Sequence, residues 1–281
     1  MIVDRINEYL AANELTFDWY IQKEVGQLAE WSFSRQFMKK DEYDSTGKLH
    51  MSSIGKCERQ LAYKYHGIQG EGKSIDGRAR MNFFFGDLAE LVLIKLAKLS
   101  GVPLIGTGQD QVRITLPLNS TGNEISGYPD GFLVDGREIK TVSIKSMPSF
   151  RFRAFEKGDI DDSYIAQANI EMLATGLSEC VMVALCKDNG VFGERIIERS
   201  QAVVNKLRQS AKVVIKSTPK ELPAARYEPN NKGKYPWQCL YCAHWKLCKP
   251  NAQKVLKGKN YELHEPLNTK EQLTESLELA A

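Results

Sequence analysis

Residues 127–141 read GYPDGFLVDGREIKT, two runs of strand-forming residues joined by Asp135-Gly136. An Asp-Gly pair between such runs is a strong β-hairpin signal. Side chains alternate across a strand, so Glu138 and Lys140 are predicted to point to the same face. Asp130 lies on the preceding strand, where we expect it to approach Glu138. This segment therefore predicts two carboxylates and an amine gathered on one face of a sheet.

Two neighbouring carboxylates in a fold are costly unless a cation neutralises them. Oxygen ligands with open water positions suit Mg²⁺ or Mn²⁺, and such an ion can activate water and polarise a phosphoryl oxygen. An amine such as Lys140 can orient the attacking water or stabilise the charge of the transition state. These residues indicate phosphodiester hydrolysis. The alternative is a hairpin with solvent-facing charges, because Glu-x-Lys is a common pattern.

Pro129-Asp130 followed by Glu138-Ile139-Lys140 resembles the core motif of the PD-(D/E)xK nuclease superfamily. The resemblance implies that Asp130, Glu138 and the backbone carbonyl of Ile139 hold the metal ion, Mg²⁺ or Mn²⁺. It also implies that Asp130, Glu138 and Lys140 are catalytic.

Predicted helices before and after the hairpin supply further candidates. In the RecB-type branch of the family, a carboxylate or His follows a Gly by four positions, and Glu90 stands in that place. The resemblance implies that Glu90 is a metal ligand and assists catalysis, with Asp87, one helical turn earlier, as a competitor. Many relatives have His there, which leaves the metal preference open. Gln167 matches a Gln that contacts substrate or water, but Glu171 follows it where relatives often have Tyr. Tyr164 is a candidate substitute for that Tyr.

Four of the six cysteines form a second candidate site. Cys239, Cys242 and Cys248 follow a C-x2-C-x5-C pattern, and Cys57 is the natural fourth ligand. In a reducing compartment, clustered cysteines are more often metal ligands than disulfides. Zinc and a [4Fe–4S] cluster both suit such thiols, and His244 is an alternative zinc ligand. The order of these cysteines resembles iron–sulfur RecB-type nucleases, including CRISPR-associated iron–sulfur nucleases and AddB-type subunits, which implies a structural [4Fe–4S] cluster.

The order of the predicted elements indicates an α/β protein with a central mixed sheet flanked by helices. The resemblance implies a restriction-endonuclease-like core with a helical portion stapled by the iron–sulfur cluster. We expect an N-terminal helical arm at 1–47, a nuclease domain at 48–260 and an acidic, flexible tail at 261–281. Patterning predicts helices at 52–66, 83–99, 161–175 and 198–217, and strands at 111–118, 124–134, 137–144, 180–187 and 191–197.

Composition is that of a folded protein with a basic body. The 281 residues are 42% hydrophobic and 26% charged, which allows a large core and excludes global disorder. No apolar run could cross a membrane and residues 1–14 are no secretory signal, so we expect a reducing intracellular compartment. This is the cytoplasm, or the host cytoplasm if the chain is phage-encoded.

The net charge is +3, and residues 262–281 carry five Glu and one Lys (−4), which leaves +7 elsewhere. A basic body suggests a polyanion; a solvated lysine face is the alternative.

DNA, single-stranded or with a free end, is the substrate that the resemblance implies. We expect a metal-dependent exonuclease in recombination, repair or replication, with a homo-oligomer or a replication or recombination protein as a further partner. Candidate backbone contacts are Lys56, Arg59, Arg78, Arg80, Lys145, Arg151, Arg153, Lys232 and Lys234. Candidate base-stacking aromatics are Phe150, Phe152, Tyr235 and Trp237.

Two other functions stay open. A non-catalytic DNA-binding module with a structural metal would bind DNA without metal-dependent cleavage. Residues 67–74, GIQGEGKS, match the phosphate-binding loop of ATPases, in which Lys73 would contact phosphate. However, the residues before this motif read as a polar helix, where a phosphate-binding loop requires a buried strand. A Gly-rich loop without nucleotide is therefore the better interpretation.

Overall fold

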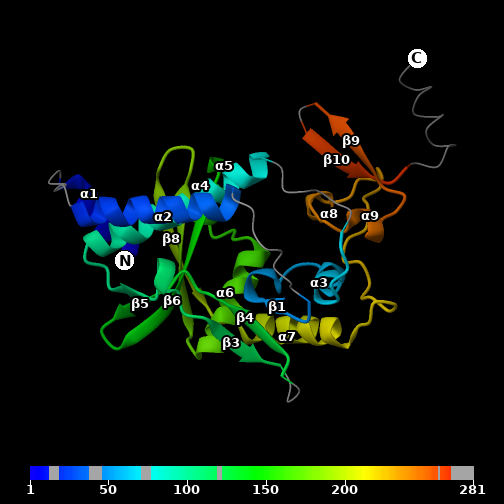
Figure 1. The fold of residues 1–281 in the computed structure, drawn as a ribbon, viewed down its shortest axis with the longest axis horizontal. Helices are drawn as coiled ribbons and strands as arrows, with labels where there is room; N and C mark the ends of the chain where they lie inside the picture. The colour runs from blue at the N-terminus through cyan, green and yellow to red at the C-terminus, as the bar shows by residue number, and fades with distance from the viewer. Residues whose placement is uncertain (13–18, 38–45, 71–76, 119–121, 259, 267–281) are drawn as a thin grey trace. The chain divides into compact units, whose positions relative to one another are not determined.

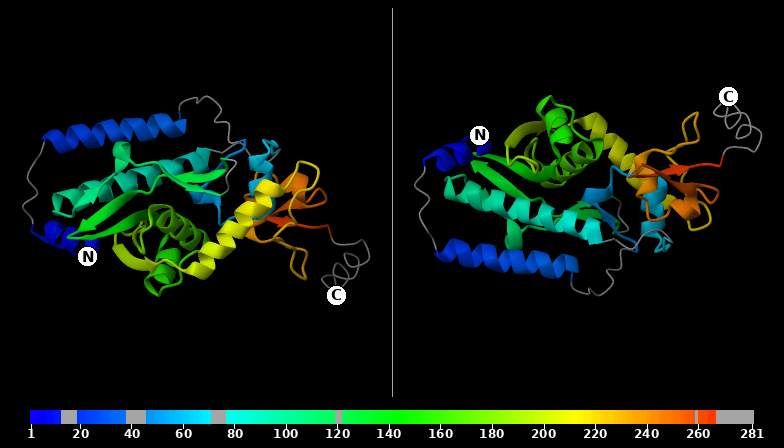
Figure 2. Two further views of the ribbon diagram at one scale, coloured as in Figure 1. Left: turned by 90° about the horizontal axis from the view of Figure 1, so that it is seen from below. Right: turned by 90° about the horizontal axis from the view of Figure 1, so that it is seen from above.

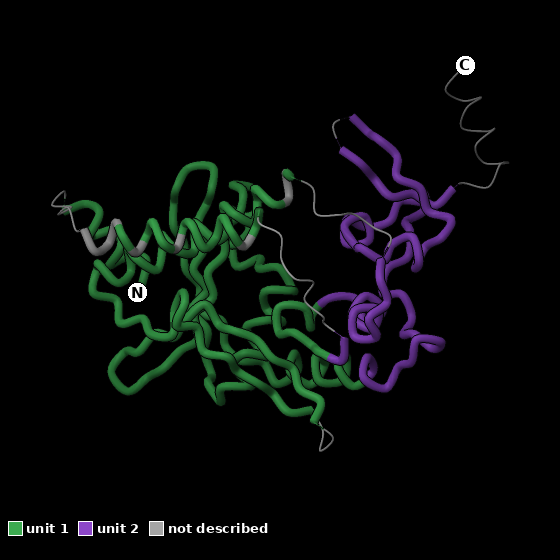
Figure 3. The backbone as a smooth tube through the Cα atoms, viewed as in Figure 1, with its two compact units in different colours: residues 1–44, 48–55, 75–212 green, residues 45–47, 56–74, 213–281 purple. Residues whose placement is uncertain are grey.

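The structure is a computed structural model that describes residues 1–12, 19–37, 46–70, 77–118, 122–258 and 260–266. The chain forms two compact units (Figure 3). Unit 1 comprises residues 1–44, 48–55 and 75–212, and unit 2 comprises residues 45–47, 56–74 and 213–281. None of the helices in the described ranges combines the length and the apolarity that a membrane span requires.

A five-stranded mixed sheet is the centre of unit 1 (Figure 1). Its strands are, in spatial order, β2 (Leu104–Ile105), β5 (Gly131–Asp135), β6 (Glu138–Met147), β7 (Glu179–Cys186) and β8 (Phe192–Glu198). All neighbours are antiparallel except β6 and β7, whose parallel pairing requires a crossover connection. That connection contains α5 (Ser149–Glu156) and α6 (Asp162–Thr175). A central mixed sheet flanked by helices confirms the predicted α/β fold class.

Helices cover both faces of this sheet (Figure 2). Residues of α1 (Ile2–Ala11) and α4 (Gly77–Leu99) share one core cluster with Val181 and Val183 of β7. Residues of α5 and α6 share another cluster with Cys180 and Met182. Successive side chains of β7 thus enter opposite cores, as alternation along a strand requires. The outermost helix, α2 (Trp19–Phe37), packs against α4.

A second, three-stranded sheet of unit 1 contains β1 (Leu49–His50), β3 (Ile114–Pro117) and β4 (Glu124–Gly127). The single strand predicted at 124–134 is therefore wrong, because β4 and β5 belong to different sheets. Pro129 lies between them, and a proline cannot donate a ladder hydrogen bond. The chain leaves one sheet at Gly127 and enters the other at Gly131, and this break places Asp130 directly before β5.

Most other predicted elements are confirmed within a few residues. The helices predicted at 83–99, 161–175 and 198–217 correspond to α4, α6 and α7 (Gln201–Lys216), and the strands at 180–187 and 191–197 to β7 and β8. The helix predicted at 52–66 is shorter, with a 3-10 turn, η1 (Met51–Ser53), before α3 (Glu58–Tyr65). A second 3-10 turn, η2 (Gly108–Asp110), precedes β3. The division at 47 and 260 stays a prediction; β10 (Asn260–His264) crosses the second boundary, and residues 267–281 of the acidic tail lie outside the described residues.

Unit 2 contains α3, the end of α7, the short helices α8 (Trp237–Leu240) and α9 (Trp245–Cys248), and a hairpin of β9 (Gln253–Lys257) and β10. Its small core cluster consists of Tyr235, Trp245, Ala252 and Leu263.

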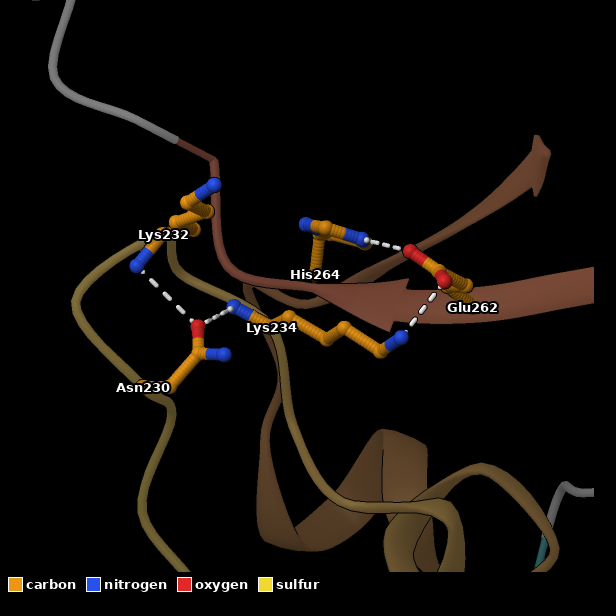
Figure 4. A network of polar contacts seen from close by, with 5 residues as sticks. All are labelled: Asn230, Lys232, Lys234, Glu262 and His264. Carbon is orange, nitrogen blue, oxygen red and sulfur yellow. Dashed lines mark hydrogen bonds and ion pairs between the residues drawn. The ribbon is translucent and has the colours of Figure 1, made fainter.

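A polar network ties the loop before α8 to β10 (Figure 4). The side-chain oxygen of Asn230 accepts from the backbone N–H groups of Lys232 and Lys234, both at 3.0 Å. The carboxylate of Glu262 accepts from Lys234 Nζ at 2.5 Å and contacts His264 Nε2 at 2.8 Å. The hydrogen bonds from Lys234 and His264 lower the pKa of Glu262 to about 2. The network therefore fixes this loop with a carboxylate that stays ionised at neutral pH.

Candidate active site

An acidic cavity of about 320 Å³ lies in unit 1 beside the start of β5. Three of the carboxylates that line it come from separate segments, Glu90 of α4, Asp130 before β5 and Glu171 of α6, and Asp87 of α4 is a fourth. The amides of Gln111 and Gln167 belong to the same wall, and Gln111 Nε2 donates to Glu90 Oε1 at 3.5 Å. The fold thus brings together Glu90, Asp130 and Gln167, which the sequence predicts as site residues.

Asp130 is held by strand β6. Its Oδ2 accepts from the backbone N–H of Ile144 at 2.6 Å and lies 3.7 Å from Lys145 Nζ. Burial disfavours the charged form of Lys145, but the carboxylates of Asp130 and Glu171, with smaller contributions from Tyr164 and Glu90, outweigh burial and raise its pKa. Lys145 is therefore a fixed cation beside the carboxylates, and the ring of Tyr164 lies 5.5 Å from its Nζ.

Glu171 is the most buried of the three carboxylates, at 1% exposure. Its Oε1 accepts from Gln167 Nε2, one helical turn earlier, at 2.8 Å, whereas its Oε2 is buried without a hydrogen-bond partner. Burial, opposed by the bond from Gln167 and reinforced by Asp130, raises the pKa of Glu171 to about 7. A carboxyl with this pKa can hold or release a proton near neutral pH, and its free oxygen could accept a cation.

The structure does not bring Glu138 or Lys140 to this cavity. In the β5–β6 ladder, Asp135 pairs with Glu138 and Leu133 with Lys140. Asp130 lies at the other end of the hairpin, about five residues along β6 from Glu138, which is roughly 17 Å. The expectation that Asp130 approaches Glu138 is therefore wrong. Lys140 instead pairs with two other carboxylates, Glu179 Oε2 at 2.5 Å and Glu138 Oε2 at 3.6 Å, and the hydrogen bond to Glu179 raises the pKa of Lys140.

The alternation of side chains along β6 gives a second reason why Glu138 and Lys140 lie away from the cavity. Val142 and Ile144 of β6 face the core with α1 and α4, whereas Met147 faces the core with α5 and α6. Odd-numbered residues of β6, Ser143 and Lys145 among them, therefore share the face of α6, and even-numbered residues belong to the opposite face.

The strand register also separates the predicted carbonyl ligand, Ile139, from Asp130. Ile139 pairs with Val134, remote from Asp130, and it is Ile144 whose backbone contacts Asp130. The segment Ser143-Ile144-Lys145 therefore occupies the place expected for Glu138-Ile139-Lys140.

Glu171 is the residue that the sequence reasoning missed. In the segment beside Asp130 a Ser, Ser143, occupies the position of the expected carboxylate, and Glu171 supplies a carboxylate from α6 instead. No local spacing signals this role, because Glu171 enters the site through the packing of α6 on β6. Asp87, the predicted competitor of Glu90, also lines the cavity and accepts from Gln36 Nε2 at 2.9 Å.

Across the part of the chain that the structure describes, no three Cys, His, Asp or Glu side chains are grouped as a metal ion requires. The three carboxylates share a cavity rather than a single point. Mg²⁺ commonly keeps several waters and uses one or two carboxylates together with substrate phosphates, so a preformed cage is not a requirement for such an ion. The oxygen donors and the unpartnered Glu171 Oε2 fit a hard divalent cation.

The four cysteines of the predicted metal site lie together in unit 2. Cys57, Cys239, Cys242 and Cys248 all line one small cavity of about 30 Å³. Burial, with the neighbouring Cys248, Cys57 and Cys242, raises the pKa of Cys239 to about 11. The thiols are therefore close enough to disfavour one another's ionisation, and a bound cation would relieve this repulsion. His244 stacks on Tyr63 and its Nε2 contacts Ile68 O at 2.9 Å, whereas its Nδ1 is buried without a partner.

Some of the predicted nucleic-acid contacts are exposed, and others are buried or paired within the protein. Phe152 and Tyr235 are 4% and 3% exposed, so their predicted stacking on bases is wrong. Phe150 and Trp237 are exposed. Several predicted cations have protein partners: Arg59 donates to Pro223 O, Arg80 to Gln36 O, Arg151 to Asp161 and Lys234 to Glu262. Burial lowers the pKa of Lys56, and the side chain of Arg78 lies outside the described residues.

The chain matches no protein-family model, and no curated protein matches it. Among solved structures it is similar to the crystal structure of SSO0001, with 16% identity and a TM-score of 0.49 over 78% of this chain and 92% of that chain. It is also similar to an alkaline exonuclease, LHK-Exo from Laribacter hongkongensis, with 14% identity and a TM-score of 0.39 over 66% of this chain and 90% of that chain. For LHK-Exo in complex with dAMP, the identity is 16% and the TM-score 0.43 over the same shares.

Proposed function

We propose that this chain is a nuclease that hydrolyses DNA phosphodiester bonds with a divalent cation, Mg²⁺ or Mn²⁺, in the acidic cavity of unit 1. One observation carries the proposal: Glu90, Asp130 and Glu171 converge from separate elements on a cavity beside the ammonium group of Lys145. Buried carboxylates next to a fixed cation are expensive to maintain, and such groups cluster at functional sites.

The three carboxylates would hold the cation. When bound, it generates a strong nucleophile from water and stabilises negative charge on the phosphoryl group. Lys145, fixed by Asp130, places a positive charge where the attacked phosphate gains charge. Gln167 Nε2 donates to Glu171 Oε1 and so orients this carboxylate, which leaves Oε2 for the cation.

The decisive experiment compares two pairs of variants on end-labelled DNA with Mn²⁺. Asp130→Asn and Lys145→Ala are expected to lower cleavage at least 100-fold, because each removes a charge at the reacting phosphate. Glu138→Gln and Lys140→Ala change the charges that the sequence pattern favoured and are expected to keep cleavage near the wild-type rate. Loss of cleavage only in the second pair would overturn the site. DNA binding without metal-dependent cleavage by the wild-type chain would favour a non-catalytic module.

We propose further that the enzyme acts as an exonuclease on single-stranded ends. A 5′- or 3′-labelled strand should then give a ladder of single-nucleotide steps from one end, and a circular single strand should resist. The ATPase alternative receives no support from the described residues, because helix α3 precedes the Gly-rich motif in place of a buried strand. Lys73 itself lies outside the described residues.

For unit 2 we propose that Cys57, Cys239, Cys242 and Cys248 hold a structural [4Fe–4S] cluster. The shared cavity of the four thiols supports a bound metal centre. Four thiolates also suit zinc, so zinc is the alternative occupant of this cavity. Anaerobically purified protein should be brown and contain iron and sulfide; colourless protein with stoichiometric zinc would contradict this.

A further inference from the structure

Two exposed aromatic side chains line the acidic cavity, and the hydrolytic chemistry uses neither. Trp31 of α2 is 47% exposed and Tyr128, between β4 and β5, is 53% exposed. Both line this cavity together with Asp130 and Glu171. Aromatic rings beside a phosphate-processing site offer flat apolar faces to any base attached to that phosphate.

The position of Tyr128 is fixed by the backbone on either side. A Cβ on Gly127 would lie 2.8 Å from Met51 Cβ, so the chain passes too close to η1 for any larger residue. Pro129 follows and is buried, and proline fixes its own φ and restricts the residue before it. The ring of Tyr128 therefore starts from a rigid segment two residues before Asp130, and stacking on it costs little conformational entropy.

Trp31 is positioned by its own helix. The next residue, Ser32, is 1% exposed and also lines the cavity, so this turn of α2 packs against the rest of unit 1. Trp31 therefore lies at the edge of the buried face of the helix. One turn further along, Gln36 Nε2 donates to Asp87 Oδ2 at 2.9 Å and ties α2 to α4 beside the same cavity. Trp31 is thus part of the wall of the site rather than a side chain on a remote surface.

We propose that Trp31 and Tyr128 stack on the unpaired bases of a single-stranded DNA end and so position its terminal phosphodiester at the carboxylates and Lys145. This inference rests on the proposed nuclease function and adds the binding mode of the substrate. Bases within a duplex already stack on one another, whereas an unpaired base has free faces for both rings. Stacking is independent of sequence, since every base has a π-face.

The test uses oligonucleotides with natural ends and matched oligonucleotides whose last two nucleotides at each end are abasic. With natural ends, Trp31→Ala and Tyr128→Ala are each expected to lower kcat/KM roughly ten- to hundredfold, mainly through KM. Trp31→Phe and Tyr128→Phe should recover most of this loss. Phe33→Ala is the matched control, because Phe33 lies on the same helix, is 52% exposed and does not line the cavity.

The abasic strand separates stacking from a structural effect. The wild type should lose about as much on abasic ends as the double variant Trp31→Ala/Tyr128→Ala loses on natural ends, and the double variant should lose little more on abasic ends. If the variants lose as much activity relative to the wild type on abasic ends as on natural ends, the rings act structurally and the proposal is overturned. Cleavage rates of the variants on natural ends that equal the rate of Phe33→Ala would overturn it as well. If the wild type cleaves neither strand, the nuclease function fails, and the affinity for the two strands is then measured in Ca²⁺. Equal affinity of the wild type for natural and abasic ends overturns base stacking. A preference of the wild type for natural ends that Trp31→Ala loses supports base stacking.

Discussion

At the level of single side chains, Glu171 shows how a buried carboxyl can lower stability while serving a site. Its pKa of about 7 lies above the ordinary value of 4.5. Between these values the folded protein holds a proton that the unfolded chain releases, so the stability of the metal-free fold falls as pH rises through this window. Glu171→Gln removes this pH-dependent loss of stability, because an amide does not ionise, and it keeps a side-chain oxygen that can accept the hydrogen bond from Gln167.

We therefore expect Glu171→Gln, without divalent cations at pH 8, to be more stable than the wild type by roughly 1–3 kcal/mol, because a pKa that folding raises by one corresponds to about 1.4 kcal/mol. At pH 4 the difference should vanish, and cleavage should be lost at any pH. Urea unfolding in a chelator at both pH values checks this. A variant no more stable than the wild type at pH 8 would show that Glu171 is not held protonated by burial.

Ser143 permits a test of where the site's carboxylate can come from. It is 2% exposed, lies on the face of β6 that carries Lys145, and precedes the Ile144 N–H that holds Asp130. Adding Ser143→Asp to Glu171→Gln returns a carboxylate to this face, and we expect at least tenfold more cleavage than with Glu171→Gln alone. Ser143→Ala in the same background is the control. A double variant as inactive as its control would mean that only α6 can present this carboxylate.

Among the elements, α1 illustrates a helix held by its buried face and its first turn. Ile2, Val3 and Ile6 are buried, with Ile2 and Ile6 at 1% and 0% exposure, in the cluster shared with α4 and the central sheet. The buried Glu194 of β8 accepts a hydrogen bond from Val3 N at 2.9 Å. A carboxylate at a helix N-terminus satisfies one of its unpaired N–H groups and interacts favourably with the helix dipole.

Ile6→Ala is expected to lower the free energy of unfolding of unit 1 by about 2–5 kcal/mol, because it opens a cavity in a fully buried position. Asn7→Ala, on the exposed side of the same helix, should change stability by less than about 0.5 kcal/mol. Denaturant unfolding of both variants measures the difference. Equal stability of the two would mean that α1 does not contribute to the cooperative core.

The hairpin of β5 and β6 shows how far local pattern predicts and where it stops. The Asp135-Gly136 turn and a strand on either side of it could be predicted from residue types, because turn chemistry and alternation are local properties, although the first strand begins only at Gly131. The length of β6 could not: the strand continues to Met147, and the residue opposite Asp130 depends on this extension. A Glu-x-Lys pattern near the turn therefore looked catalytic although the site lies at the far end of the strands.

The same limit applies to the site as a whole. That Glu90, Asp130 and Gln167 line one cavity could be predicted, because each stands at the offset that the family resemblance assigns to it. Lys145 and Glu171 enter the site through packing of α6 on β6, a long-range arrangement that no local spacing encodes. The aromatic pair of the cavity was missed for the same reason, since Trp31 and Tyr128 lie 97 positions apart in the sequence.

The whole molecule combines a large core in unit 1 with a much smaller one in unit 2. The described core cluster of unit 2 has four buried residues, and small units with little buried apolar surface commonly depend on a metal centre or disulfides. All six cysteines are free thiols, so no disulfide serves this purpose. Folding of unit 2 should therefore depend on the proposed cluster, whereas unit 1 has two apolar cores around its central sheet.

Cys239→Ser is accordingly expected to bleach the protein and to remove amide-exchange protection from residues 235–264, while β6 and β7 stay protected. Hydrogen exchange with mass spectrometry on the full chain, prepared anaerobically, measures both units at once. Cys180→Ala is the matched control, because this thiol is buried in unit 1 and lies outside the cysteine cavity. It should leave the colour and the protection of unit 2 intact. Unchanged protection of residues 235–264 in a bleached Cys239→Ser variant would show that unit 2 folds without a metal centre.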